Sequence, residues 1–131
     1  MMNQFIILLA SNSEAEKNIA EARIILSLAF PEGARFSENH WSATLVKEGQ
    51  PAPQGECARY LNAVCVAQSV STLRDIQVVL KKIESDMGRI RSVETQGRVA
   101  IDLDLVEWNG EILRPKDTIQ GYYQACLKDL M

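Results

Sequence analysis

Apolar and polar positions in the first half of the chain fall into blocks whose length and period predict secondary structure. A continuous apolar run at residues 5–10, followed by serine and asparagine, predicts a buried strand. Apolar residues then recur at helical spacing from 15 to 29, and Pro31 ends that pattern. The pattern is weaker at 35–45, where we expect a strand, whereas residues 60–68 predict a second strong strand.

The second half of the chain repeats the order of helix and strand and then adds a hairpin. Residues 73–87 carry an apolar stripe of helical period, and residues 101–105 alternate apolar with acidic side chains, as a half-buried strand does. The turn signal Trp-Asn-Gly-Glu at 108–111 predicts a hairpin, and Pro115 favours the start of a short helix running to Leu127. The order β-α-β-β-α-β predicts an α+β fold, a ferredoxin-like sandwich with a mainly antiparallel sheet, plus a C-terminal hairpin and short helix.

Composition narrows the class of protein without revealing its chemistry. The chain has 131 residues, the length of one domain, so residues 1–131 are expected to form a single domain. A net charge of -3 argues against a nucleic-acid coat and against binding to an anionic membrane surface. The first apolar run is too short to cross a bilayer, and three cysteines without paired spacing fit a reducing compartment. A cytoplasmic protein is therefore expected. The sequence leaves its oligomeric state open.

The strand at 101–105 carries the first candidate site. Asp102 and Asp104 are two residues apart, so on a strand both carboxylates point to the same face while the intervening apolar residues face the core. Paired carboxylates can hold Mg²⁺ together with phosphate oxygens, and two such ions can clamp a phosphoryl group during transfer. The alternative is an ordinary solvated strand face, which shows the same alternation.

A local excess of positive charge precedes this strand. Between residues 81 and 98 there are five cations and three anions, in a chain that is acidic as a whole. Arginine forks match phosphate oxygens, so arginines near a magnesium site are typical of polyphosphate binding. A solvated basic loop is the other interpretation. The five cations are Lys81, Lys82, Arg89, Arg91 and Arg98.

Several of these segments together resemble one protein family. The motifs are Tyr-Leu-Asn-Ala at 60–63, the run Ile-Glu…Gly-Arg-Ile-Arg…Glu at 83–94, and Asp-Leu-Asp-Leu at 102–105. They stand in the same order and spacing as in 6-hydroxymethyl-7,8-dihydropterin pyrophosphokinase, and Ala-Ser-Asn at 10–12 is similar to that family's Gly-Ser-Asn. The resemblance runs from about residue 5 to about residue 113. It identifies the chain as a divergent and C-terminally shortened member.

The resemblance implies a kinase of folate biosynthesis that moves diphosphate from ATP to the pterin hydroxymethyl group and releases AMP. It implies that Asp102 and Asp104 are catalytic and hold two Mg²⁺ ions. It also implies a pterin site made by Tyr60, Asn62 and Asp102, in which Asn62 reads the hydrogen-bonding edge of the pterin. The implied ATP contacts are Glu84, Arg89, Arg91 and Arg98, of which Arg89 and Arg91 also serve catalysis.

The chain also departs from the family pattern, and these departures keep other functions open. The family places an arginine three residues before the first aspartate, where this chain has Val99 with Arg98 one residue earlier. The family's tryptophan is replaced by Gln96, and no histidine or arginine matching its later phosphate contacts is found after the hairpin. One alternative is a non-catalytic relative that binds a nucleotide, a pterin or a partner protein. Another is an unrelated ferredoxin-like interaction domain.

Overall fold

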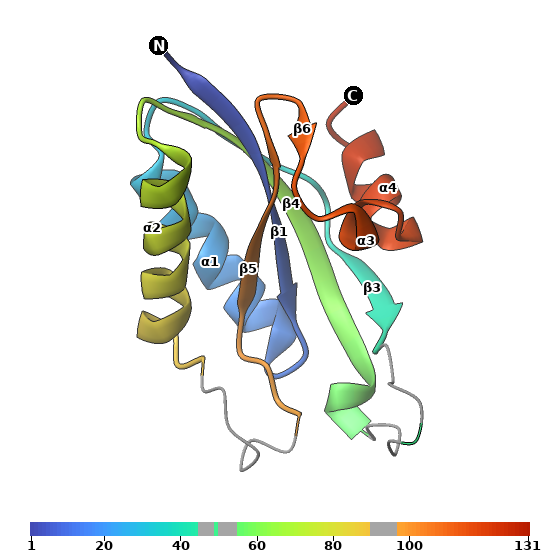
Figure 1. The fold of residues 1–131 in the computed structure, drawn as a ribbon. Helices are drawn as coiled ribbons and strands as arrows, with labels where there is room; N and C mark the ends of the chain where they lie inside the picture. The colour runs from blue at the N-terminus through green and yellow to red at the C-terminus, as the bar shows by residue number, and fades with distance from the viewer. Residues whose placement is uncertain (45–48, 50–54, 90–96) are drawn as a thin grey trace.

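An antiparallel sheet forms the centre of this computed structural model, which describes residues 1–44, 49, 55–89 and 97–131 (Figure 1). The described strands are β1 (Asn3–Ser11), β2 (Ala34–Phe36), β3 (His40–Ala43), β4 (Arg59–Ser69), β5 (Asp102–Trp108) and β6 (Glu111–Ile112). Their order across the sheet is β2-β4-β1-β5-β6, and β3 pairs with β4 as well. The two strands that follow helices, β2 and β5, thus lie on opposite sides of β1 and β4. This is the ferredoxin-like arrangement that the order of elements predicted.

The helices lie on both faces of the sheet. The described helices are α1 (Ala15–Ala29), α2 (Leu73–Asp86), α3 (Pro115–Thr118) and α4 (Gly121–Lys128), with a 3-10 turn at Gly55–Ala58. Figure 1 shows α1 and α2 together on one face and α3 and α4 on the other. Within the described part of the chain, no helix is long and apolar enough to cross a membrane.

The central strand β1 is apolar on both faces because both are covered. Phe5, Ile7 and Leu9 belong to the main core beneath α1 and α2, and each of them is at most 1% exposed. Leu8 points to the other face and packs in a smaller cluster with Tyr123 of α4. A strand buried on both faces reads as a continuous apolar run, which explains the pattern at residues 5–10.

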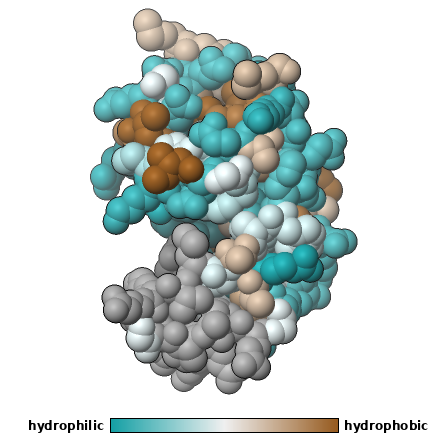
Figure 2. Space-filling view, turned by 90° about the vertical axis from the view of Figure 1, so that its right-hand side faces the viewer, coloured by the Kyte–Doolittle hydropathy of each residue, from teal (hydrophilic) through white to brown (hydrophobic). Residues whose placement is uncertain are grey.

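The smaller cluster also shows how far α4 covers its face of the sheet. Tyr123 and Cys126 of α4 pack on Leu8, Val64 and Val106, which come from three adjacent strands. The side of the molecule seen in Figure 2 is mainly hydrophilic, with scattered apolar side chains. Beyond the α4 cluster, the polar ends of β4 and β5 share this face, and there the candidate site lies.

Two predicted elements differ in detail from the structure. The weak pattern at 35–45 corresponds to two short strands, β2 and β3, which both pair with β4 inside the sheet. The predicted final helix is two helices, because Gln120 is extended (φ -71°, ψ 144°) and interrupts it. The carbonyl of Thr118, at the end of α3, accepts a hydrogen bond from Gln124 Nε2 at 2.6 Å. The interruption allows α4 to take its own direction and pack Tyr123 against the sheet.

Candidate active site

The two aspartates share one face of the sheet, as the alternation predicted. Asp102 is paired with Ala10 of β1, and Asp104 is paired with Leu8. Leu103 lies between them and belongs to the core under α1 and α2, so the carboxylates face the opposite side. This is the face that α4 covers only in part.

Ala10 creates a hollow in this face. It is paired with Asp102 on one side and with Asn62 of β4 on the other, and its small side chain leaves space between them. A cavity of about 250 Å³ opens there. Its lining comes from four strands and the C-terminal segment, and comprises Leu8, Ala10, Ser42, Ala43, Thr44, Tyr60, Asn62, Asp102, Asp104, Arg114, Asp117 and Tyr122.

The predicted pterin residues Tyr60 and Asn62 therefore lie around the same cavity as the two aspartates. The Asn62 side chain is buried, and its Nδ2 donates to the His40 carbonyl and to Ser42 Oγ, both at 2.9 Å. These bonds fix the orientation of the amide. Within the described residues no group donates to its Oδ1, so this oxygen could accept a hydrogen bond from a ligand.

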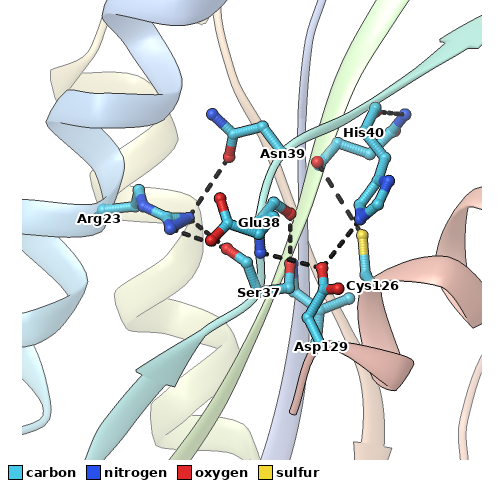
Figure 3. A network of polar contacts seen from close by, with 9 residues as sticks. Arg23, Ser37, Glu38, Asn39, His40, Cys126 and Asp129 are labelled. Atoms are coloured by element: carbon cyan, nitrogen blue, oxygen red, sulfur yellow. Dashed lines mark hydrogen bonds and ion pairs between the residues drawn. The ribbon is translucent and has the colours of Figure 1, made fainter.

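The β3 wall of the cavity is held in place from both layers of helices (Figure 3). From α1, both terminal nitrogens of Arg23 donate to the Ser37 carbonyl at 2.8 Å. From the end of α4, Asp129 Oδ2 accepts from the Glu38 backbone N–H at 3.1 Å and lies 2.9 Å from His40 Nε2. The junction of β2 and β3 is thus fixed by side chains on either side of the sheet.

The electrostatics of the aspartate pair favour a proton or a cation. Burial, together with the charges of Asp104 and Glu84, raises the pKa of Asp102 to about 6, and the charge of Arg89 opposes this shift. Burial also raises the pKa of Asp104, and there the charge of Arg114 opposes the shift. A cation bound between two neighbouring carboxylates with raised pKa values would stabilise their ionised forms.

Glu84 joins α2 to the aspartate strand. Its side chain is 2% exposed, and its Oε2 accepts a hydrogen bond from the Leu103 backbone N–H at 2.7 Å. The other oxygen lies 3.3 Å from Lys81 Nζ. Glu84 therefore supplies a hydrogen-bond acceptor to the backbone of β5 at Leu103, between the two aspartates. A direct contact with ATP stays a prediction.

Arg114 is a site residue that the sequence analysis missed. Its Nη1 lies 3.9 Å from Asp104 Oδ1, and its Nε donates to Asp117 Oδ2. The sequence signal for this contact was the hairpin turn at 108–111. If the pairing of Glu107 with Ile112 is continued along the two strands, residue 114 lies opposite residue 105, next to Asp104. Arg114 thereby reaches the site from the returning arm of the hairpin.

A second cavity of about 400 Å³ lies along the outer edge of β5. β6 pairs only with Glu107 and Trp108, so among the described residues no strand lies beside the earlier part of this edge. Four leucines and four polar residues line the cavity: Leu80, Leu103, Leu105, Leu113, Gln77, Lys81, Asp104 and Arg114. Asp104 and Arg114 line both cavities, so the two spaces meet at these residues.

Asn12, in the segment that resembles Gly-Ser-Asn, has a clear structural role. Its side chain donates from Nδ2 to the Gly97 carbonyl at 2.9 Å and accepts from the Val99 N–H at 2.6 Å. Its own backbone N–H donates to the Val99 carbonyl at 3.1 Å. The asparagine thus fastens the segment that enters β5, and with it the position of the aspartates.

The predicted arginines are placed unevenly. Arg89 lies close enough for its charge to oppose the raised pKa values of both Tyr60 and Asp102. Arg98 is exposed on the segment that leads into β5 and is not among the described residues that line the two cavities. Arg91 lies outside the described residues. The phosphate-binding roles of all three stay predictions.

The donor set suits magnesium better than a transition metal. Among the described residues, no three histidine, cysteine, aspartate or glutamate side chains form a metal-binding group. Mg²⁺ commonly uses one or two carboxylates and takes its other ligands from water and substrate phosphates. The raised pKa values of Asp102 and Asp104 show a pair that a divalent cation would stabilise.

Fold and site together define an α+β protein with a ferredoxin-like sheet and an acidic pair, one member of which lines two cavities. Sequence comparison identifies the family: the chain belongs to the 7,8-dihydro-6-hydroxymethylpterin-pyrophosphokinase (HPPK) family, whose model matches residues 6–130. It is also 30% identical over 76 residues to the folic acid synthesis protein FOL1 of Dictyostelium discoideum. That match covers 58% of this chain and 11% of the much longer relative.

Proposed function

We propose that this protein transfers diphosphate from ATP to 6-hydroxymethyl-7,8-dihydropterin in folate biosynthesis, with AMP as the leaving group. Membership of the HPPK family supports this reaction, and the similarity to a folic acid synthesis protein points to the same biosynthetic route. The observation that carries the proposal is that two cavities meet at Asp104 and Arg114. A group transfer needs a donor and an acceptor whose reacting ends meet, and these cavities supply two such spaces.

The cavity at the β5 edge suits the nucleotide. Its leucines offer an apolar surface to a purine base. Lys81 stands at its rim and Arg114 at its inner end, so a chain of phosphates would lead from the base toward the aspartates.

The cavity above Ala10 suits the acceptor. Tyr60 contributes an aromatic ring, while Asn62 Oδ1 and the Ser42 hydroxyl contribute hydrogen-bonding groups. A flat heteroaromatic ring with several N–H groups matches this combination. The hydroxymethyl group of such a ligand would point toward Asp102 and Asp104 at the far side of the cavity.

In the proposed reaction, the acceptor oxygen forms a bond to the β-phosphorus of ATP, the bond from that phosphorus to the bridging oxygen breaks so that this oxygen leaves with AMP, and the hydroxyl proton is released to solvent. Asp102 and Asp104 would hold Mg²⁺, which supplies charge neutralisation on the transferred phosphates. Asn62 and Tyr60 would orient the acceptor, and Arg89 would add positive charge beside Asp102. The residues thus act through positioning and electrostatics.

The deciding experiment is an assay for AMP with the purified chain, Mg-ATP and the hydroxymethyl dihydropterin. We expect AMP from the wild type and none from Asp104→Asn, because that substitution removes a metal ligand. Glu107→Gln is the matched control, since Glu107 lies on the same strand outside both cavities and should keep activity. A folded wild type that forms no AMP would exclude the kinase. If Mg-ATP still raised its Tm, the binding alternative would stand in its place.

A further inference from the structure

Arg114 has two acidic partners with different geometry. Its Nε is held by Asp117 of α3 through a direct hydrogen bond, whereas its Nη1 is 3.9 Å from Asp104 Oδ1. The first contact anchors the guanidinium, and the second is at the outer limit of an ion pair. The Arg114 side chain is half exposed, so its outer nitrogens are able to exchange one acceptor for another.

The contact with Asp104 compensates part of the negative charge of that carboxylate, which Lys81 also opposes. Asp104 is a half-buried carboxylate beside Asp102, and the charge of Arg114 is the largest of those that oppose its raised pKa. A metal ion bound by Asp104 would take over this compensation. The outer nitrogens of Arg114 would then lack an anion at the point where the two cavities meet.

We propose that Arg114 is a placeholder cation: it pairs with Asp104 when no metal is bound, and it binds phosphate oxygens of the nucleotide when Asp104 ligates the metal. The inference rests on the proposed function for the identity of the nucleotide. Asp117 keeps the guanidinium in place during the exchange, because it binds Nε and leaves the two Nη groups as a fork for phosphate.

The proposal predicts effects of opposite sign on two ligands. Without nucleotide, Arg114 competes with the metal for Asp104, so Arg114→Gln should bind Mn²⁺ roughly two- to fivefold more tightly. With nucleotide, the same substitution removes a charged contact to phosphate, so affinity for a non-hydrolysable ATP analogue with Mg²⁺ should fall roughly ten- to a hundredfold. If Arg114 had only a structural role, the substitution would weaken the binding of both ligands. If Arg114 only bound phosphate, the substitution would leave the affinity for Mn²⁺ unchanged.

Calorimetric titration of Mn²⁺ alone, and then of the ATP analogue with Mg²⁺, tests both halves. Lys116→Gln is the matched control, because Lys116 is an exposed cation two residues away that lines neither cavity, and its loss changes the net charge equally. We expect both affinities of this control to stay at the wild-type level. Equal tightening of Mn²⁺ in Lys116→Gln and Arg114→Gln would show a general charge effect and overturn the proposal.

Arg114→Lys provides a second variant that retains the charge. It should keep the wild-type Mn²⁺ affinity and still lose affinity for the nucleotide, because an ammonium has no planar fork. Unchanged or weaker Mn²⁺ binding by Arg114→Gln, or an unchanged nucleotide affinity, overturns the proposal. These titrations need no turnover. If Arg114→Gln shows both opposite effects but the wild type forms no AMP, the proposed reaction is contradicted while the placeholder role of Arg114 is supported.

Discussion

Replacing Asp102 by asparagine should stabilise the metal-free protein while removing its function. Burial raises the pKa of this carboxyl from 3.8 to about 6, so its ionised form is less favourable in the folded chain than in the unfolded one. The folded state therefore binds the proton more tightly. The stability that the protonated Asp102 carboxyl contributes is complete below its unfolded pKa and is lost as pH rises through its folded pKa of about 6.

The size of this effect follows from the difference between the two pKa values. From 3.8 to about 6 is roughly two units, which corresponds to at most about 3 kcal/mol at neutral pH. Asparagine keeps the shape and removes the charge, but it also removes the attraction to Arg89. We therefore expect Asp102→Asn to gain about 1–3 kcal/mol at pH 7.5, equivalent to a rise in Tm of roughly 4 °C per kcal/mol.

Urea unfolding of both proteins in EDTA, at pH 5 and at pH 7.5, measures this gain. Comparison at each pH cancels the titration of the other carboxylates, so the gain should be large at pH 7.5 and should shrink at pH 5. Asp86→Asn is the control, because Asp86 is exposed on α2 and its substitution should change stability by less than about 0.5 kcal/mol.

Magnesium should then reverse the order of stability of the two proteins. Mg²⁺ is expected to stabilise the wild type through the aspartate pair and to have little effect on Asp102→Asn. The reasoning would be refuted if Asp102→Asn were the less stable protein in EDTA at pH 7.5. It would also be refuted by a difference between the two proteins that is the same at pH 5.

Three further predictions concern groups that support the site. Asn12→Ala should lower the free energy of unfolding by about 1–3 kcal/mol in urea, because a buried amide with two backbone partners is lost. Glu84→Ala should cost a similar amount, since it leaves the Leu103 N–H without its acceptor, whereas Glu84→Gln should retain most of the stability in the same assay. A hydrogen bond from His40 lowers the pKa of Asp129, so Asp129 stabilises the fold above its unfolded pKa and loses that contribution as pH falls through its folded pKa. In an NMR titration, His40→Ala should raise the pKa of Asp129, and an unchanged value would contradict this pairing.

Much of the fold could be predicted because local pattern and tertiary structure agree in this chain. The apolar run at 5–10 is continuous since β1 is covered on both faces, and the alternation at 102–105 reflects one covered and one open face. The shared face of Asp102 and Asp104 follows from the period of two along a strand, and the structure confirms it. The ferredoxin-like order required only the sequence of elements.

The remaining features depend on contacts between segments that local periodicity does not encode. Arg114 reaches Asp104 through the register of a hairpin, and its role becomes visible only when both cavities are placed. The junction of β2 and β3 is fixed by Arg23 and Asp129, which lie more than a hundred residues apart in the sequence. Such contacts depend on how helices pack across the sheet, so the pattern at 35–45 was too weak to divide into two strands.

The position of the site follows from where the second face of the sheet changes from apolar to polar. Along β1, Leu8 packs under α4, whereas Ala10, two residues further on the same face, lies between Asn62 and Asp102. Because Ala10 is small and α4 packs elsewhere, the polar ends of three strands surround a hollow instead of a packed interface. Burial there raises the pKa values of the aspartates, and in the proposed function this same burial would strengthen their attraction to a cation and its phosphates. Binding of a cation would thus offset the free energy that the metal-free fold loses at Asp102.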